Sequence, residues 1–108
     1  MEFIKQSGER QGSRYVTEYE GYYIAVQTTA AATEQGIGAG RIHRLLLYPA
    51  HTNQVRGKVL VYDQGWHDGI PQLQEQRELV ERTVMHFDQV PLDWVQEERR
   101  LASYSWMA

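Results

Sequence analysis

The sequence has no cysteine among its 108 residues, and it has no long apolar run. Without cysteine there is no disulfide framework, no thiolate metal ligand and no cysteine nucleophile. The apolar stretches fall well short of the ~18 residues that a membrane span needs. The first residues, MEFIKQSGERQG, also lack the apolar core of a signal peptide. We therefore expect a soluble, cytoplasmic protein.

Positive charge is scarce where a nucleic-acid-binding protein would need it. Residues 1–70 hold equal numbers of basic and acidic side chains, so the net charge of −3 arises in residues 71–108. Nucleic-acid-binding surfaces usually carry clustered Lys and Arg. The basic residues nearest to such a cluster are Arg41, Arg44, Arg56 and Lys58. We interpret them as a solvated rim, and a nucleic-acid-binding module that uses them stays open as an alternative.

The chain does contain a clear order of patterns. Strand-like segments fill roughly the first 63 residues, and helix-like segments run from about Pro71 to Tyr104. Strands followed by helices indicate an α+β domain with helices packed on one face of an antiparallel sheet. Length and composition suit one globular domain. We predict a flexible tail over residues 1–13 and a single domain over residues 14–108, with a meander of three to four strands and one or two C-terminal helices.

Four segments have the alternation and the β-branched or aromatic content of strands, namely residues 14–19, 22–28, 41–48 and 57–63. Glu20 and Gly21 suit a tight hairpin turn between the first two. In the second strand Tyr22, Ile24 and Val26 share a face.

The third strand, residues 41–48, is the most apolar of the four. Strict alternation puts Ile42 on the same side as Leu46, with Leu45 on the opposite side. Both sides are therefore apolar, and we expect this strand to be central and covered on both faces.

Two helices are predicted after the sheet. Pro71 suits the first helical position, and Leu73, Val80 and Val84 follow helical spacing. Pro91 ends this helix. The second helix runs from Leu92 to about Tyr104. Its four consecutive charged residues are interpreted as a solvated face: Glu97, Glu98, Arg99 and Arg100.

Two loops hold chemically capable residues. Residues 30–40 (AAATEQGIGAG) are rich in glycine but lead into a strand, whereas a phosphate-binding loop leads into a helix. We interpret them as a mobile hairpin loop.

Residues 63–68 (DQGWHD) place Asp63, His67 and Asp68 close in sequence, as oxygen and imidazole ligands for a divalent metal. The loop lacks the fixed spacing of known metal motifs, so we interpret it as a strand-to-helix turn with Trp66 over the core edge. A metal- or small-ligand-binding enzyme around this loop is the second alternative.

Three segments together resemble a known layout: Tyr19-Glu-Gly-Tyr-Tyr-Ile24, then Val59-Leu-Val-Tyr-Asp63, then an amphipathic helix that ends in Phe87. Over residues 14–88 the pattern resembles small uncharacterised bacterial proteins with a β-β-β-α layout similar to the double-stranded-RNA-binding domain. The resemblance implies the fold. The basic cluster with which RNA-binding domains open this helix is missing after Gly69.

Tyrosine is the residue type that points most directly to a function. Six tyrosines lie on or beside predicted strands, so some of these rings are expected on the outer sheet surface, where Tyr is enriched at protein interfaces. We predict a non-enzymatic protein-interaction or accessory module that binds an unknown protein or a second copy of itself. No catalytic residue, cofactor or metal ligand is assigned. The candidate partner-binding residues are Tyr15, Tyr23, Arg41, Arg44, Trp66 and His67.

Overall fold

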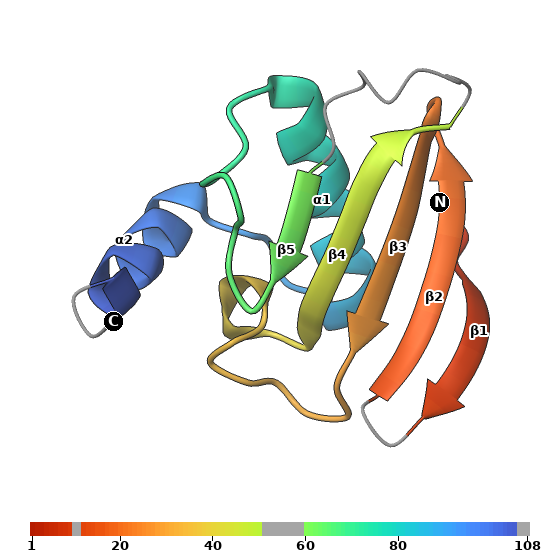
Figure 1. Cartoon of the computed structure of the whole chain (residues 1–108), viewed down its shortest axis with the longest axis horizontal. Helices are drawn as coiled ribbons and strands as arrows, with labels where there is room; N and C mark the ends of the chain where they lie inside the picture. The colour runs from red at the N-terminus through yellow and green to blue at the C-terminus, as the bar shows by residue number, and fades with distance from the viewer. Residues whose placement is uncertain (10–11, 51–59, 106–108) are drawn as a thin grey trace.

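A computed structural model describes residues 1–9, 12–50 and 60–105. They form one antiparallel sheet of five strands in the order β1-β2-β3-β4-β5, followed by two helices (Figure 1). Each strand pairs with its neighbour in sequence, which confirms the predicted α+β meander. The elements are β1 (Ile4–Glu9), β2 (Gly12–Tyr19), β3 (Tyr22–Thr28), the 3₁₀ turn η1 (Ile37–Ala39), β4 (Ile42–Pro49), β5 (Leu60–Asp63), α1 (Gln74–Asp88) and α2 (Trp94–Ser105).

The prediction of three to four strands is wrong because β1 was not recognised. The predicted tail is likewise wrong for Ile4–Glu9, which pair with β2 through Ile4↔Val16 and four further positions. This segment is mostly polar, as edge strands often are. Its place in the sheet comes from main-chain hydrogen bonds to β2, and side-chain patterns do not report those bonds.

The hairpin between β2 and β3 forms as predicted. Glu20 and Gly21 have φ values of 50° and 80°, the geometry of a two-residue turn that matches the twist of paired strands. The seven registered pairs from Ser13↔Thr28 to Tyr19↔Tyr22 follow from this turn. On β3, Tyr22, Ile24 and Val26 share the face that packs against the core.

A β-bulge in β4 changes which side chains share a face. Thr28 pairs with Ile42 and Gln27 pairs with Arg44, so His43 is the extra residue. Ile42 therefore lies fully buried on the side of Leu45. The prediction that Ile42 shares a face with Leu46 is wrong, because strict alternation does not allow for the inserted residue.

Helix α1 covers one face of the sheet, which we call the inner face (Figure 1). The helix begins at Gln74, and Leu73 before it is extended and 41% exposed. The predicted start at Pro71 is therefore wrong, and so is the assignment of Leu73 to the helical spacing of Val80 and Val84. The core forms between α1, the inner face and η1, and its buried members include Ile24, Val26, Ile37, Leu45, Leu47, Tyr62, Leu79, Val80 and Val84.

Helix α2 lies to the side of the sheet, beyond β5 (Figure 1). Asp93 caps it, because its Oδ1 accepts hydrogen bonds from the backbone N–H groups of Val95 at 2.9 Å and Gln96 at 3.3 Å. Among the described residues, no helix packs on the sheet face opposite α1, so the expectation that β4 is covered on both faces is wrong. None of the helices in the described part of the chain has the length and apolar content to cross a membrane.

Candidate functional site

The sheet face opposite α1, which we call the outer face, carries side chains in ordered rows. Residues that pair across antiparallel strands point to the same side, so the register defines three rows. The polar row consists of Arg14, Gln27, Arg44 and Asp63. The apolar row consists of Ile4, Val16, Ala25, Leu46 and Val61. The aromatic row consists of Glu18, Tyr23 and Tyr48.

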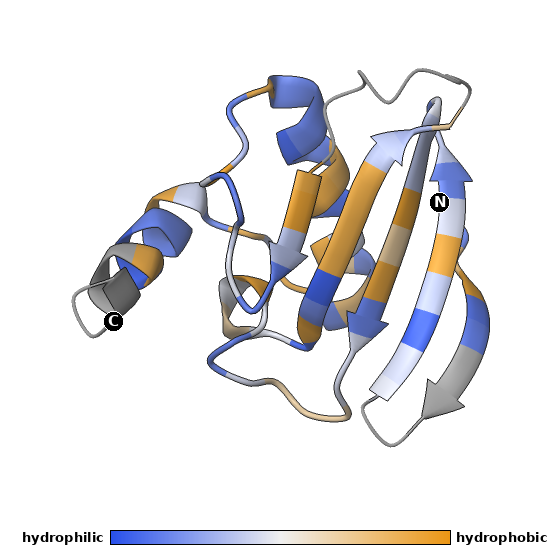
Figure 2. Cartoon of the chain, viewed as in Figure 1, coloured by the Kyte–Doolittle hydropathy of each residue, from blue (hydrophilic) through white to orange (hydrophobic). Residues whose placement is uncertain are grey.

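The apolar row crosses all five strands, and Figure 2 shows apolar colour along the middle of the sheet. Ile4 at its β1 end is 69% exposed. Val16 and Ala25 are nearly buried although no described helix covers them. A partner on this face would therefore contact the flanking rows and the larger apolar side chains, Ile4, Leu46 and Val61.

The aromatic row forms a ridge on one side of the apolar row. The rings of Tyr23 and Tyr48 face each other across β3 and β4, with centroids 5.0 Å apart and planes at 37°. Cross-strand aromatic pairs of this kind stabilise a sheet. They also present rigid, amphipathic contact area of the type enriched at protein interfaces.

The polar row is held together by Arg44. Its guanidinium donates to Asp63 Oδ2 at 3.1 Å and to Gln27 Oε1 at 3.5 Å. The hydrogen bond from Arg44 lowers the pKa of the Asp63 carboxyl, and its charge adds to this effect. An exposed ion pair adds little stability, so its main effect is to fix the positions of these two side chains.

A shallow hollow of about 260 Å³ lies between the polar and apolar rows. It forms over Ala25, whose small side chain leaves space among longer neighbours on the outer face. The outer-face residues that line it are Arg14, Ala25, Gln27, Arg44, Leu46, Val61 and Asp63.

A second, polar hollow of about 580 Å³ adjoins the bulge in β4. Arg44 and Asp63 separate it from the first, and His43 lines it. Burial lowers the pKa of His43, the charge of Arg44 lowers it further, and Asp63 partly opposes the change. His43 Nδ1 is buried and makes no hydrogen bond to a described residue.

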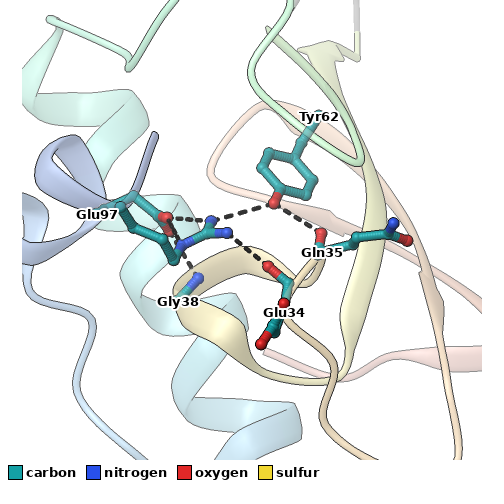
Figure 3. Close-up of polar contacts among 6 residues, drawn as sticks. Glu34, Gln35, Gly38, Tyr62 and Glu97 are labelled. Carbon is teal, nitrogen blue, oxygen red and sulfur yellow. Dashed lines mark hydrogen bonds and ion pairs between the residues drawn. The ribbon is translucent and has the colours of Figure 1, made fainter. Parts of the chain in front are cut away.

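A buried polar network links α2 to the loop of residues 30–40 (Figure 3). Glu97 is 2% exposed, and its carboxylate accepts hydrogen bonds from the Gly38 backbone N–H at 2.6 Å and from Arg100 Nε at 2.6 Å. Arg100 also pairs with the same carboxylate through its terminal nitrogen. The prediction of a solvated face is therefore wrong for Glu97 and Arg100, because tertiary packing turns this side of α2 inward.

Arg100 joins the network to β5. It donates to the Glu34 carbonyl at 2.7 Å and to the Tyr62 hydroxyl at 3.2 Å, and that hydroxyl donates to the Gln35 carbonyl at 2.8 Å. Burial disfavours the charged guanidinium, but its hydrogen bonds and the Glu97 charge outweigh burial and raise the pKa of Arg100. These contacts anchor the loop, so we assign the network a structural role.

Of the six predicted partner-binding residues, Tyr23 and Arg44 lie together on the outer face. Tyr15 lies on the inner face with its ring 4.9 Å from that of Phe87. Trp66 is buried, as the turn interpretation predicts, and its ring is 4.8 Å from that of Tyr62.

The last two predicted residues lie off the outer face. Arg41 donates to the carbonyls of Thr29 and Phe87, both at 3.1 Å, and joins the loop to the end of α1. His67 is exposed in the turn after β5. Sequence reasoning missed Gln27, Leu46 and Val61 as outer-face residues because the register that aligns them was unknown.

The alternative sites are less well supported. Asp63, His67 and Asp68 do not converge, and the described residues contain no group of three His, Asp or Glu side chains arranged to hold a metal ion. Arg41 and Arg44 are engaged by other groups of the chain. The other two residues of the predicted basic group, Arg56 and Lys58, lie outside the described residues.

Comparison with known proteins adds a family. No curated protein and no solved structure matches the chain. A family model described as "Domain of unknown function" matches residues 8–88, which contain strands β2–β5 and helix α1 but not α2. The matched region is most of the chain and holds every outer-face residue except Ile4. The chain therefore belongs to the domain family of unknown function DUF7678.

Proposed function

We propose that this chain is a non-enzymatic interaction module that binds a protein partner with its outer face. One observation carries the proposal: a sheet face that no described helix covers has an apolar row between a tyrosine ridge and an ordered polar row. A sheet normally buries one face and leaves a polar face in water. An apolar row flanked by aromatic and charged side chains instead has the composition of an interface.

The buried polar network that links α2 to the loop of residues 30–40 supports this choice, because its role is structural. The buried groups of Glu97, Arg100 and Tyr62 satisfy one another, which suits a structural anchor. The outer face is then the surface best equipped for recognition. Because the sequence lacks cysteine, we place this function in the reducing environment of the cytoplasm.

The test is a capture experiment with three versions of the full-length tagged chain, applied to nuclease-treated lysate of the source organism. Leu46→Glu introduces a charge into the middle of the apolar row, where a docked partner would have to desolvate it. Met85→Glu introduces the same charge at an exposed position of α1, on the other side of the sheet, and serves as the matched control. Thermal melts first establish that both variants fold.

We expect the wild-type chain and Met85→Glu to retain the same proteins, an untagged copy of the chain included, and Leu46→Glu to lose them. Equal capture by all three versions would refute the proposal. Material that binds only without nuclease, and that depends on salt as phosphate contacts do, would replace protein binding by nucleic-acid binding.

A further inference from the structure

The outer face has opposite relief on the two sides of its apolar row. On one side the aromatic row carries the paired rings of Tyr23 and Tyr48. On the other side, toward the polar row, lies the hollow over Ala25. A surface with a ridge and a hollow on opposite sides of a line can pack against a copy of itself turned over about that line. Such packing is the isologous arrangement of two-fold symmetric dimers.

We propose that the partner of the outer face is a second copy of this chain, related to the first by a two-fold axis along the apolar row. The inference rests on the proposed function and names its partner. Because the axis crosses the strands, it places each polar-row residue opposite the aromatic-row residue of the same strand in the second copy. The apolar rows of the two copies then face each other.

The charges on β2 support this axis. Arg14 and Glu18 are exposed and lie two residues on either side of Val16. About 13 Å of strand separates them, so they do not pair within one chain. The two ion pairs of the described residues are formed by other side chains. The axis puts Arg14 of each copy opposite Glu18 of the other, which forms two symmetric pairs.

The central strands are complementary in the same way. Gln27 faces Tyr23 of the second copy on β3, and Arg44 faces Tyr48 of the second copy on β4. A guanidinium over a tyrosine ring is a favourable cation–π contact. Both rings of the second copy thereby enter the hollow beside the polar row. The aromatic row of each copy therefore packs into the hollow of the other copy.

A two-fold axis parallel to the strands fits less well. It would place the Tyr23 ridge against the ridge of the second copy and leave the two hollows facing each other. With this axis over the central strand β3, it would also bring Arg14 opposite Arg44 of the second copy, where like charges meet. The axis along the apolar row is therefore the one that both packs the aromatic row into the hollow and brings Arg14 opposite Glu18.

Geometry sets the strength that we expect. Five strands about 4.8 Å apart and five residues rising about 3.3 Å each cover a face of roughly 24 by 16 Å. Two such faces bury roughly 770 Å², below the size of a stable specific interface and in the range of weak, transient contacts. Packed sheets cross at about 30°, which displaces Arg14 from Glu18 by roughly 5 Å, within reach of these side chains. The dimer should be weak and dependent on concentration.

The test is sedimentation equilibrium of the full-length chain from about 1 μM to about 500 μM, with charge-reversed variants. We expect the wild-type mass to rise from one chain toward two. Arg14→Glu and Glu18→Arg should each stay monomeric, because each faces like charges across the axis. An equimolar mixture of these two variants should recover the dimer, since every contact between them then joins opposite charges. Arg99→Glu, at an exposed position of α2, is the control and should dimerise like the wild type.

Three results would overturn the proposal. They are a wild-type chain that stays monomeric throughout, a dimer that neither reversal weakens, and a mixture that fails to recover the dimer. The proposed function fails separately. If the chain is monomeric while Leu46→Glu still abolishes capture, the outer face binds a different protein and the self-association is wrong.

Discussion

The inner and outer faces of the sheet both carry tyrosine and leucine, but these side chains have different surroundings on the two faces. On the inner face, Tyr62 is 1% exposed and its hydroxyl is hydrogen-bonded at the edge of the core. On the outer face, Tyr23 and Tyr48 pair with each other, and no described helix covers them. Leu47 and Leu46 repeat the contrast, since Leu47 is fully buried and Leu46 is partly exposed. The difference shows that composition does not tell a core residue from an outer-face residue, whereas the position of α1 does.

The largest expected difference in stability between the two faces is at Leu47 and Leu46. Leu47→Ala should lower the free energy of unfolding by about 3 kcal/mol, because it removes buried contacts and leaves a cavity. Leu46→Ala should lower it by less than about 1 kcal/mol. Urea unfolding of both variants measures the two values. Equal losses would mean that the outer face is covered in the free chain and would invalidate the comparison.

The next largest loss of unfolding free energy is expected in the buried network of Glu97 and Arg100. Glu97→Ala removes the acceptor for Gly38 N–H and leaves Arg100 without its charge partner. We expect a loss of about 3 kcal/mol, since a buried charge without a partner is costly. Glu97→Gln keeps an acceptor for Gly38 and should lose less. The matched control, Glu98→Ala on the exposed side of α2, should change urea unfolding little, and a loss as large as that of Glu97→Ala would contradict the assignment.

Substitution of one tyrosine on each face should give a smaller difference in stability. Tyr62→Phe removes one donor and one acceptor from the network and should cost about 1–2 kcal/mol. Tyr23→Ala should lower the melting temperature by only a few degrees, because it loses the pairing with Tyr48, while it weakens binding through the outer face. Thermal melts and the sedimentation experiment measure the two effects. A collapse of the melting temperature in Tyr23→Ala would show that Tyr23 belongs to the core.

The smallest effect is expected at the rim of the outer face. Burial lowers the pKa of His43 in the folded chain, so the unfolded chain binds this proton more readily. The resulting stability is fully present above the unfolded pKa of about 6.5 and is lost as pH falls through the lower, folded value. Urea unfolding at several pH values between about 7.5 and 5 should show this loss. His43→Gln should reduce it, and an unchanged pH profile in His43→Gln would contradict the prediction.

Much of the fold follows from local patterns. The Glu20-Gly21 turn, the strands on either side of it and the order of sheet before helices depend on neighbouring residues, so the sequence predicts them. The core side of β3 follows from its alternation. The edge strand β1 was missed because main-chain pairing places it in the sheet, and a polar side-chain pattern does not reveal such pairing.

The candidate site was predicted only in part. Tyr23 and Arg44 were identified as candidates, but Tyr15, Arg41 and Trp66 proved to have structural contacts. Residues far apart in sequence make up the outer-face rows, and the register that aligns them is a property of paired strands. Sequence periodicity reports on one element at a time.

The sequence by itself determined the α+β class, the hairpin and the composition that makes a tyrosine-bearing sheet possible. The tertiary structure decided the rest. The bulge at His43 set the faces of β4, and packing of α1 chose which side became the core. Docking of α2 turned Glu97 from an apparently solvated charge into a buried anchor. In each case the outcome depends on contacts between segments distant in sequence, whose energies local patterns do not contain.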